Sequence, residues 1–357
     1  MKKLLAMVLT AVMSLTFMTG CLQNQTLAPS SSAASSEPSS TAPSSETSSA
    51  NTNVRVFKLG NAGAVGEPAA QVCQLFCDMA NDRLKGQIVF EFYPAEQLGN
   101  EVTMLENLQV DLQQAMMCAI DTLANYSPDL NIISMAFAFE NHDHLFKYFE
   151  SDLSKPAFDK LEEQGIHVLS YNFKKNPRIL FGKKPFVTPA DMKGVKFRIP
   201  NIPIFEKNIR QMGATPTVVA WSEYPFALMQ GVVDAGECTK EAMYSCKFYE
   251  SCKYISEVDY GYPLEALSFS TQAWNSLTPE QQKILEECAA AASEEFNTVI
   301  NNKWEDDKKK LIEEGVTFVD FDKQAFIDQM APLAAQLEAE NFWDTPGLYE
   351  KVQQLKG

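Results

Sequence analysis

The sequence offers little that would suit nucleic-acid binding or histidine chemistry. Its 357 residues include 30 Lys and Arg against 46 Asp and Glu, a formal charge of -16, and only three His. A chain this acidic presents no general basic surface to a polyanion, which argues against nucleic acid as a partner. A Gly-x-Ser-x-Gly elbow, a His-Glu-x-x-His motif and a phosphate-cradling glycine loop are also missing. An exported enzyme that relies on carboxylates is kept only as an alternative.

One long apolar run occurs, at residues 4–17, directly after two lysines. It is too short to span a membrane as a mature helix and is typical of a secretory signal covering residues 1–20. The Met-Thr-Gly-Cys sequence that ends at Cys21 resembles a bacterial lipobox. By that resemblance, Cys21 becomes the lipidated first residue of the mature protein. An ordinary signal peptide with a chance cysteine is the alternative.

Residues 21–53 are too polar to form a core. Ser accounts for 11 of the 20 residues at 30–49, and three prolines lie close by. We interpret this segment as a flexible tether with a span of ~30 Å as a random coil. A lipid anchor and a tether place the folded body, from Val54 onward, at the outer face of the cell membrane.

The remaining seven cysteines do not form the pattern of a disulfide framework. Cys73 and Cys77 share a helical face, but no second pair supplies further metal ligands. We therefore expect no metal and no cofactor, and buried free thiols instead. Disulfides among Cys73, Cys77, Cys246 and Cys252 stay open, because an exported protein can form them.

Hydrophobic patterns predict alternating strands and helices along the body. Strands are expected at residues 54–59, 88–93, 115–120, 166–171, 195–199, 232–234 and 316–319, and helices at 68–84, 101–110, 223–229, 277–314 and 323–339. This alternation is typical of an α/β body with mostly parallel sheets. The helix at 277–314 begins with a Thr-Pro-Glu signal and has no Gly or further Pro. Its length exceeds what one small domain needs, so it could lie across two lobes.

A basic segment at residues 174–198 interrupts the acidic background, with eight Lys and Arg against Asp191 alone. Most of these side chains are expected to be solvated. Arg198 is different, because it alternates with apolar Phe197 and Ile199 and precedes Pro200. An Arg at such a strand end points either to solvent or into a crevice. In a crevice, its planar guanidinium matches a carboxylate bidentately.

Several motifs resemble those of the TRAP transporter solute-binding proteins, the DctP family. The Gly-Val-Lys-Phe-Arg-Ile-Pro-Asn sequence at 194–201 is similar to the family's Gly-x-Lys-x-Arg-Val-Pro segment. The Gly-Ala-Thr-Pro turn at 213–216, the stretch at 221–234 and the Tyr-Pro-x-x-Gln-Leu-Gly sequence at 93–99 match further family motifs. The similarity runs in the same order from about residue 54 to 328.

This resemblance implies a two-lobe, periplasmic-binding-protein-like α/β fold, with two mixed β-sheets flanked by helices. A ligand cleft would separate the lobes, and the long helix would span both. Lobe I would comprise 54–175 plus about 263–300, and lobe II 176–262 plus about 301–345, with 346–357 as a C-terminal tail. The implied function is a receptor without catalysis that delivers a small organic acid to the membrane permease subunits of a TRAP transporter. A substrate-binding lipoprotein of an ABC importer or sensor system is the alternative.

The resemblance also assigns the main ligand-binding residues. The family Arg that binds the ligand carboxylate falls at Arg198, and a second family Arg falls at Arg178. Residues 172–178 are longer than the corresponding family segment, which weakens the second assignment. Asn201, after the Pro turn, could hydrogen-bond the ligand. Trp221 falls where an aromatic side chain lines the cleft, although a plain core role is its alternative.

Three further positions complete the expected site. Asn61 ends the first strand, where related receptors contact ligand, but it could simply form a turn. Glu67 lies nearby. Cys238 stands where the family usually has an Asn, and a thiol is a weak hydrogen-bond partner, so the ligand or its pose would differ. The sequence leaves the ligand open among dicarboxylates, uronates and other sugar acids, sialic-acid-like compounds and keto acids.

Overall fold

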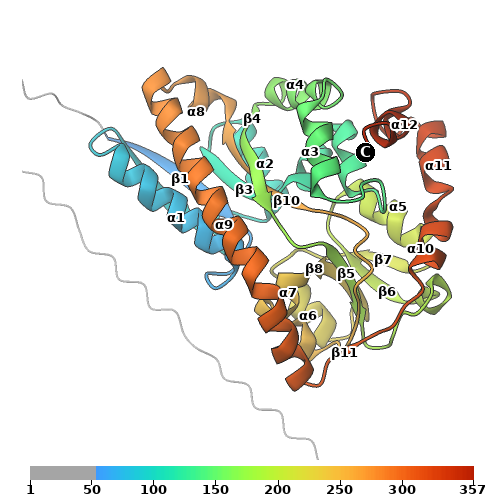
Figure 1. Cartoon of the computed structure of the whole chain (residues 1–357). Coiled ribbons are helices and arrows are strands. Elements are labelled where there is room, and N and C mark those ends of the chain that lie inside the picture. The colour runs from blue at the N-terminus through green and yellow to red at the C-terminus, as the bar shows by residue number, and fades with distance from the viewer. Residues whose placement is uncertain (1–53) are drawn as a thin grey trace, which may run out of the picture. The chain divides into compact units, whose positions relative to one another are not determined.

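The computed structural model describes residues 54–357, which form two β-sheets flanked by helices (Figure 1). The expected signal at 1–20, the lipidation site Cys21 and the tether at 21–53 lie outside the described residues. Within the described part, no helix has both the length and the hydrophobicity needed to cross a bilayer.

The first sheet has the strand order β2-β1-β3-β10-β4. Its strands are β1 (Arg55–Asn61), β2 (Ile88–Tyr93), β3 (Ala115–Ala119), β4 (Ile166–Lys174) and β10 (Leu264–Ser270). β1 pairs in parallel with β2 and β3. β10 instead runs antiparallel between β3 and β4, which makes the sheet mixed. A late part of the chain therefore lies inside the lobe that the first part builds.

The second sheet has the order β11-β9-β5-β8-β6-β7 and is also mixed. Its strands are β5 (Arg178–Gly182), β6 (Lys196–Ile199), β7 (Thr215–Val218), β8 (Ala235–Thr239), β9 (Tyr254–Ser256) and β11 (Thr317–Phe318). β6 pairs in parallel with β7 and β8, whereas β5 runs antiparallel to β8 and β9. The antiparallel pairing of β5 and β8 brings Arg178 opposite Thr239 and Ile179 opposite Cys238.

Helices pack on both sheets. They are α1 (Pro68–Arg83), α2 (Glu101–Gln109), α3 (His142–Glu150), α4 (Lys155–Glu163), α5 (Pro203–Gln211), α6 (Tyr224–Met229), α7 (Lys240–Ser245), α8 (Thr271–Asn275), α9 (Pro279–Glu313), α10 (Lys323–Met330), α11 (Leu333–Ala339) and α12 (Leu348–Gln353), with short 3-10 turns η1 (Ile120–Asn125), η2 (Pro128–Ser134), η3 (Pro189–Met192) and η4 (Phe248–Glu250). α1 illustrates how an apolar helix face packs on a sheet. Its buried Val72 and Phe76 lie in one core with Phe57 and Phe90 of the first sheet.

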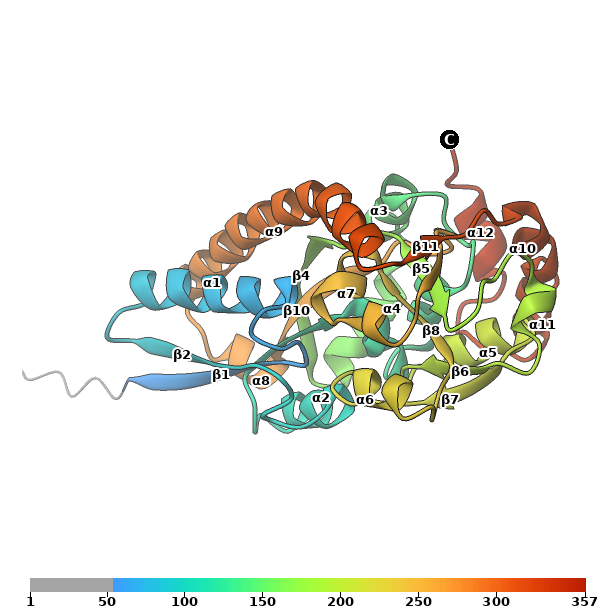
Figure 2. The same cartoon turned by 90° about the horizontal axis from the view of Figure 1, so that it is seen from below.

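The long helix α9 contributes to the cores of both lobes, as its length predicted. Thr278 and Gln281 form a capping box at its start. Leu285 and Phe296 pack in the core of the first sheet, alongside α1 and β4. Trp304 and Leu311, further along, pack in the core of the second sheet. The two views show α9 running along the outside of both lobes (Figure 2).

The chain also crosses between the sheets at residues 175–177, from β4 to β5, and at 257–263, from β9 to β10. A further contact joins α5 to η2, where the Asn208 amide donates to Ser134 O and accepts from Ala136 N at 2.7 and 3.1 Å. The last twelve residues include α12, whose Leu348 and Val352 are buried. The two chain crossings and the Asn208 hydrogen bonds therefore join the parts of the body in addition to α9.

Two expected elements differ from the structure. Residues 232–234 are not a strand: Gly231 turns the chain with a positive φ of 72°, Val232 is exposed, and β8 starts only at Ala235. The single helix expected at 323–339 is two helices, α10 and α11, because Pro332 cannot donate a backbone hydrogen bond and interrupts the helix.

Candidate functional site

A cavity of about 80 Å³ lies between the two lobes, and most of the expected ligand-binding residues line it. They are Asn61 and Glu67 from the first lobe, and Arg178, Arg198, Trp221 and Cys238 from the second. Asn201 is not among them. It is exposed and lines a neighbouring cavity of about 330 Å³, which shares Arg198 and Trp221 with the first.

Arg198 is buried in the wall of this cavity, with 3% of its surface exposed. Its Nε donates to Val219 O at 3.0 Å, and its guanidinium lies 4.4 Å from the centre of the Tyr224 ring and 5.5 Å from that of Trp221. Its Nη1 is 3.9 Å from the nearest oxygen of Glu237. Among residues 54–357, neither Nη atom donates a hydrogen bond. The side chain is thus held in place while its two Nη groups stay available to a ligand.

Arg178 has a different role, because two carboxylates already bind it. Its Nη1 donates to Glu237 at 2.6 Å and its Nη2 to Asp121 at 2.7 Å. Burial disfavours the charge, yet Glu237 and Asp121 together raise the pKa of Arg178 above its ordinary value. Asp121 belongs to the first lobe and Glu237 to the second. Arg178 therefore links the lobes across the cleft.

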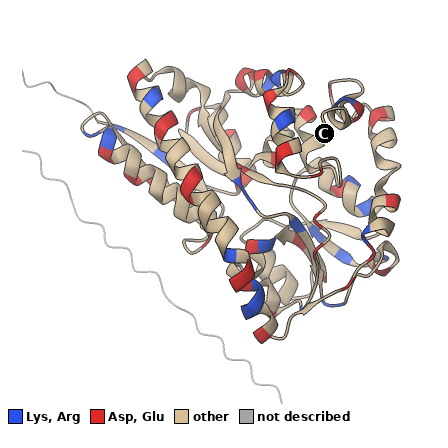
Figure 3. Ribbon diagram, viewed as in Figure 1, with Lys and Arg blue, Asp and Glu red and all other residues tan. Residues whose placement is uncertain are grey.

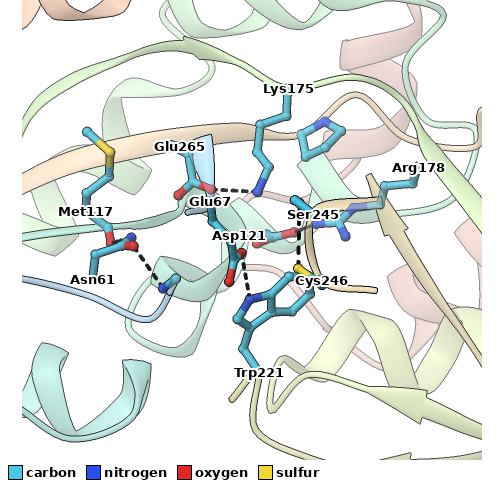
Figure 4. Close-up of polar contacts among 12 residues, drawn as sticks. Asn61, Glu67, Met117, Asp121, Lys175, Arg178, Trp221, Ser245, Cys246 and Glu265 are labelled. Atoms are coloured by element: carbon cyan, nitrogen blue, oxygen red, sulfur yellow. Dashed lines mark hydrogen bonds and ion pairs between the residues drawn. The ribbon is translucent and has the colours of Figure 1, made fainter. Parts of the chain in front are cut away.

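A second ion pair lines the cavity within the first lobe. Lys175 donates to Glu265 at 2.6 Å, as Figure 4 shows. Burial opposes the charge on Lys175, but Glu265 and Glu241 raise its pKa above the ordinary value. Glu265 is the second residue of β10, with 3% of its surface exposed. A charged residue within a buried strand was the sequence signal that could have revealed this pair.

Trp221 and Glu67 meet across the cleft. The Trp221 Nε1 donates to Glu67 at 3.1 Å, and Glu67 also accepts from Ala64 N at 2.9 Å (Figure 4). Asn61 donates to Met117 O at 2.8 Å and accepts from Gly63 N at 2.9 Å. Asn61 therefore forms the turn that the sequence left open and also lines the cavity.

Cys238 is buried on β8, with 1% of its surface exposed. Burial, followed by the nearby Glu237, raises the pKa of its thiol well above the ordinary value, so the side chain is a neutral thiol. The neighbouring Gly236 has no room for a side chain, because a Cβ would lie 1.5 Å from the Tyr224 hydroxyl. All seven cysteines of the described residues are free. Those residues also contain no cluster of three or more His, Cys, Asp or Glu that could hold a metal.

Glu101, the first residue of α2, lines the cavity and has a raised pKa. Burial, then Glu265 and Asp121, raise its pKa to about 7, and Arg198 and Lys175 only partly offset them. In the described part of the chain, no hydrogen bond reaches its carboxylate. Ionised Glu101 is therefore an unpaired charge in the cleft.

We expect this charge to lower stability as the pH rises. The pKa of Glu101 is raised in the folded state, so the favourable effect of its protonation is present below pH ~4.5 and disappears through pH 7. In the unliganded protein, the advantage of Glu101→Gln over wild type should grow between pH 5 and pH 8, by at most about 3 kcal/mol. Urea unfolding at the two pH values measures it. An advantage that does not change with pH contradicts the assignment.

The charge balance of the cavity is opposite to that of the basic segment. Its lining includes three cations and five carboxyl groups, a formal balance of 3 - 5 = -2. The cations are Lys175, Arg178 and Arg198, and the carboxyl groups are Glu67, Glu101, Asp121, Glu237 and Glu265. The other five basic residues of 174–198 do not line the cavity. Figure 3 shows acidic and basic residues interspersed over the helices outside it.

Solved structures with the same two-lobe architecture define the class. A TRAP periplasmic solute-binding protein from Ochrobacterium anthropi, with bound L-fuconate, is 30% identical with a TM-score of 0.78, covering 85% of this chain and 99% of that one. A relative from Actinobacillus succinogenes, with bound L-galactonate, is 28% identical with a TM-score of 0.78, covering 84% and 98%. The chain has the fold of an extracytoplasmic solute receptor.

The sequence comparisons give the family. The model for bacterial extracellular solute-binding protein, family 7, named DctP, matches residues 59–341. The C4-dicarboxylate-binding protein DctB of Bacillus subtilis is 25% identical over 287 residues, which cover 79% of this chain and 82% of that protein. The chain belongs to the DctP family of bacterial extracellular solute-binding proteins.

Proposed function

We propose that this protein is an extracytoplasmic receptor that binds a small organic acid in the cleft between its lobes and delivers it to a TRAP-type transporter. The observation that carries the proposal is Arg198, whose side chain is buried in the cleft wall and whose Nη groups donate no hydrogen bond within residues 54–357, so that both can donate to a carboxylate. Membership of a family of solute-binding proteins supports it. The protein acts as a receptor and catalyses no reaction.

The cleft residues have different roles in ligand binding. Arg198 binds the carboxylate, and Trp221 packs against an apolar face of the ligand. Arg178 organises the walls through Asp121 and Glu237. Asn61, Glu67 and Cys238 shape the rest of the cavity, and Asn201 contacts the ligand only where it extends into the neighbouring space.

Ligand-linked closure follows from the contacts across the cleft. We place one lobe at 54–175 with about 263–300 and the other at 176–262 with about 301–345. The pair Trp221–Glu67 and the hydrogen bond from Ser222 to Glu96 both join the two lobes near the cavity. A ligand that touches both walls binds the closed form better and shifts the population toward it.

A thermal-shift screen against organic acids tests the proposal. A carboxylate present at 100 times its Kd should stabilise the protein by about 2.7 kcal/mol, which is a clear rise in Tm. The panel should include dicarboxylates, uronates, aldonates and keto acids, with uncharged sugars as the control. A protein stabilised by the uncharged sugars and by none of the acids would not be an organic-acid receptor.

The N-terminal sequence suggests how the receptor stays near its permease. We propose that Cys21 is lipidated and that 21–53 tether the body to the outer face of the cell membrane. In the native host, Cys21→Ser should move the protein from the membrane fraction to the soluble fraction, with Cys73→Ser as the control. A Cys21→Ser protein that still fractionates with membranes contradicts the lipid anchor.

A further inference from the structure

We propose that the ligand carries a cationic amino group as well as a carboxylate, so that the receptor takes amino-bearing acids in zwitterionic form. This inference rests on the proposed function and names the chemical class of its ligand. The observation behind it is a group of three carboxyl groups in the cavity lining, Glu101, Asp121 and Glu265. An organic anion alone would not balance their negative charge.

The cavity is already too acidic for a simple anion. Its lining has a formal charge of 3 - 5 = -2 with every side chain ionised. Arg178 already forms ion pairs with two carboxylates, and Lys175 forms one with Glu265. A bound monocarboxylate would bring the total to -3 among largely buried side chains, where unbalanced charge is costly. A zwitterion adds no net charge and still supplies the carboxylate for Arg198.

Unpartnered acceptors mark where the amino group would bind. One oxygen of Asp121, one of Glu265 and the hydroxyl oxygen of Thr122 are buried and have no hydrogen-bond partner among the described residues. The three side chains are at most 3% exposed, and all line the cavity. An ammonium group has three donors and no acceptor, which is what such a set of acceptors requires.

Glu101 lies close to both kinds of charge. It lines the cavity together with Asp121 and Glu265, and it lines the neighbouring cavity together with Arg198. Its own carboxylate accepts no hydrogen bond within residues 54–357. Arg198 and the three carboxyl groups, Glu101 with the two buried acids, therefore present opposite charges to a single small molecule in one cavity.

Ligand hydroxyl groups are the alternative partners for these acceptors. They could satisfy the open oxygens as donors, but they carry no charge and would leave the total at -3. The charge balance therefore favours an amine over a polyol. Paired compounds that differ only in this group separate the two possibilities.

Isothermal titration calorimetry at pH 8 with the folded body, residues 54–357, provides the test. Three pairs share a skeleton and differ in amino versus hydroxyl, and each amino member is net neutral at pH 8: alanine and lactate, 4-aminobutyrate and 4-hydroxybutyrate, and glucosaminate and gluconate. We expect the tightest binder of the panel to be an amino member. We also expect it to bind at least about tenfold more tightly than its hydroxy partner, because a charge-assisted hydrogen bond exceeds a neutral one.

A variant then locates the amino group. Glu101→Gln keeps the shape and removes the charge, so it should weaken the amino member about tenfold and leave its hydroxy partner equal or stronger. Glu286→Gln, at an exposed position of α9, is the matched control and should change neither. A Glu101→Gln protein that loses affinity equally for both members of the pair contradicts the inference.

The panel separates this inference from the function on which it rests. If no amino member binds, or if the hydroxy members bind as tightly, the inference is overturned. Binding of a hydroxy member that disappears in Arg198→Ala would then leave the organic-acid receptor intact. Binding that persists in Arg198→Ala would overturn the carboxylate site as well.

Discussion

Arg198→Ala is expected to weaken carboxylate binding by at least about 2 kcal/mol, or roughly 30-fold in Kd. The guanidinium of Arg198 is buried, is fixed by Val219 O and the Tyr224 ring, and has two Nη groups that donate no hydrogen bond in the described part of the chain. Its removal leaves the ligand carboxylate without a charged partner in a cleft that already contains five carboxyl groups. Calorimetry with any acid found by the thermal-shift screen measures the loss.

Lys193→Ala provides the matched control for this experiment. Lys193 belongs to the same basic segment but is exposed and does not line the cavity. Its removal changes the net charge by the same amount, so any loss through long-range attraction alone would appear in both variants. Equal affinity of wild type and Arg198→Ala would contradict the assignment of the carboxylate site.

The largest effect on stability is expected from Glu237→Ala. Glu237 is 1% exposed and accepts hydrogen bonds from Arg178 at 2.6 Å and from the Tyr260 hydroxyl at 3.1 Å. Without Glu237, Asp121 is the one carboxylate among the described residues that still binds Arg178. The buried positive charge of Arg178 then has one negative partner instead of two. We expect the free energy of unfolding to fall by about 3 kcal/mol and Tm by roughly 5 to 10 °C.

Two further variants make the result specific. Glu250→Ala removes a carboxylate from an exposed position and should leave Tm within about 1 °C of wild type. Glu237→Gln retains acceptors for Arg178 and Tyr260, so it should fall between wild type and Glu237→Ala. A Tm for Glu237→Ala equal to that of Glu250→Ala would show that the buried ion pairs contribute little to the stability of the fold.

Hydrophobic periodicity predicted the elements that bury one clear face. α1, β2 and α9 occur within a few residues of their expected bounds, because their apolar positions recur at helical or strand spacing. β10 was not predicted, since all seven of its residues are buried and no alternation marks it. Its polar Glu265 and Ser268 further hide the apolar run. A strand buried on both faces thus gave a weak sequence signal.

The sequence predicted those residues of the candidate site whose side chains point to one kind of ligand group, as an Arg points to a carboxylate. Arg198 stood out as an Arg in a buried strand before a Pro turn, and the family resemblance supplied Arg178 and Trp221. The carboxyl groups that face them come from distant parts of the chain, with Asp121 after β3 and Glu265 on β10. Only the fold brings these groups together. Only three basic residues of 174–198 line the cavity, and five carboxyl groups from elsewhere in the chain make its lining net acidic.

The most direct measurement is a crystal structure of the protein with the best acid from the thermal-shift screen. The account predicts that the ligand lies in the cavity between the lobes, with its carboxylate oxygens within about 3 Å of the Arg198 Nη atoms. Arg178 should keep its bonds to Asp121 and Glu237 in that complex. A ligand whose carboxylate lies away from Arg198, or outside the cleft, would contradict the central claim.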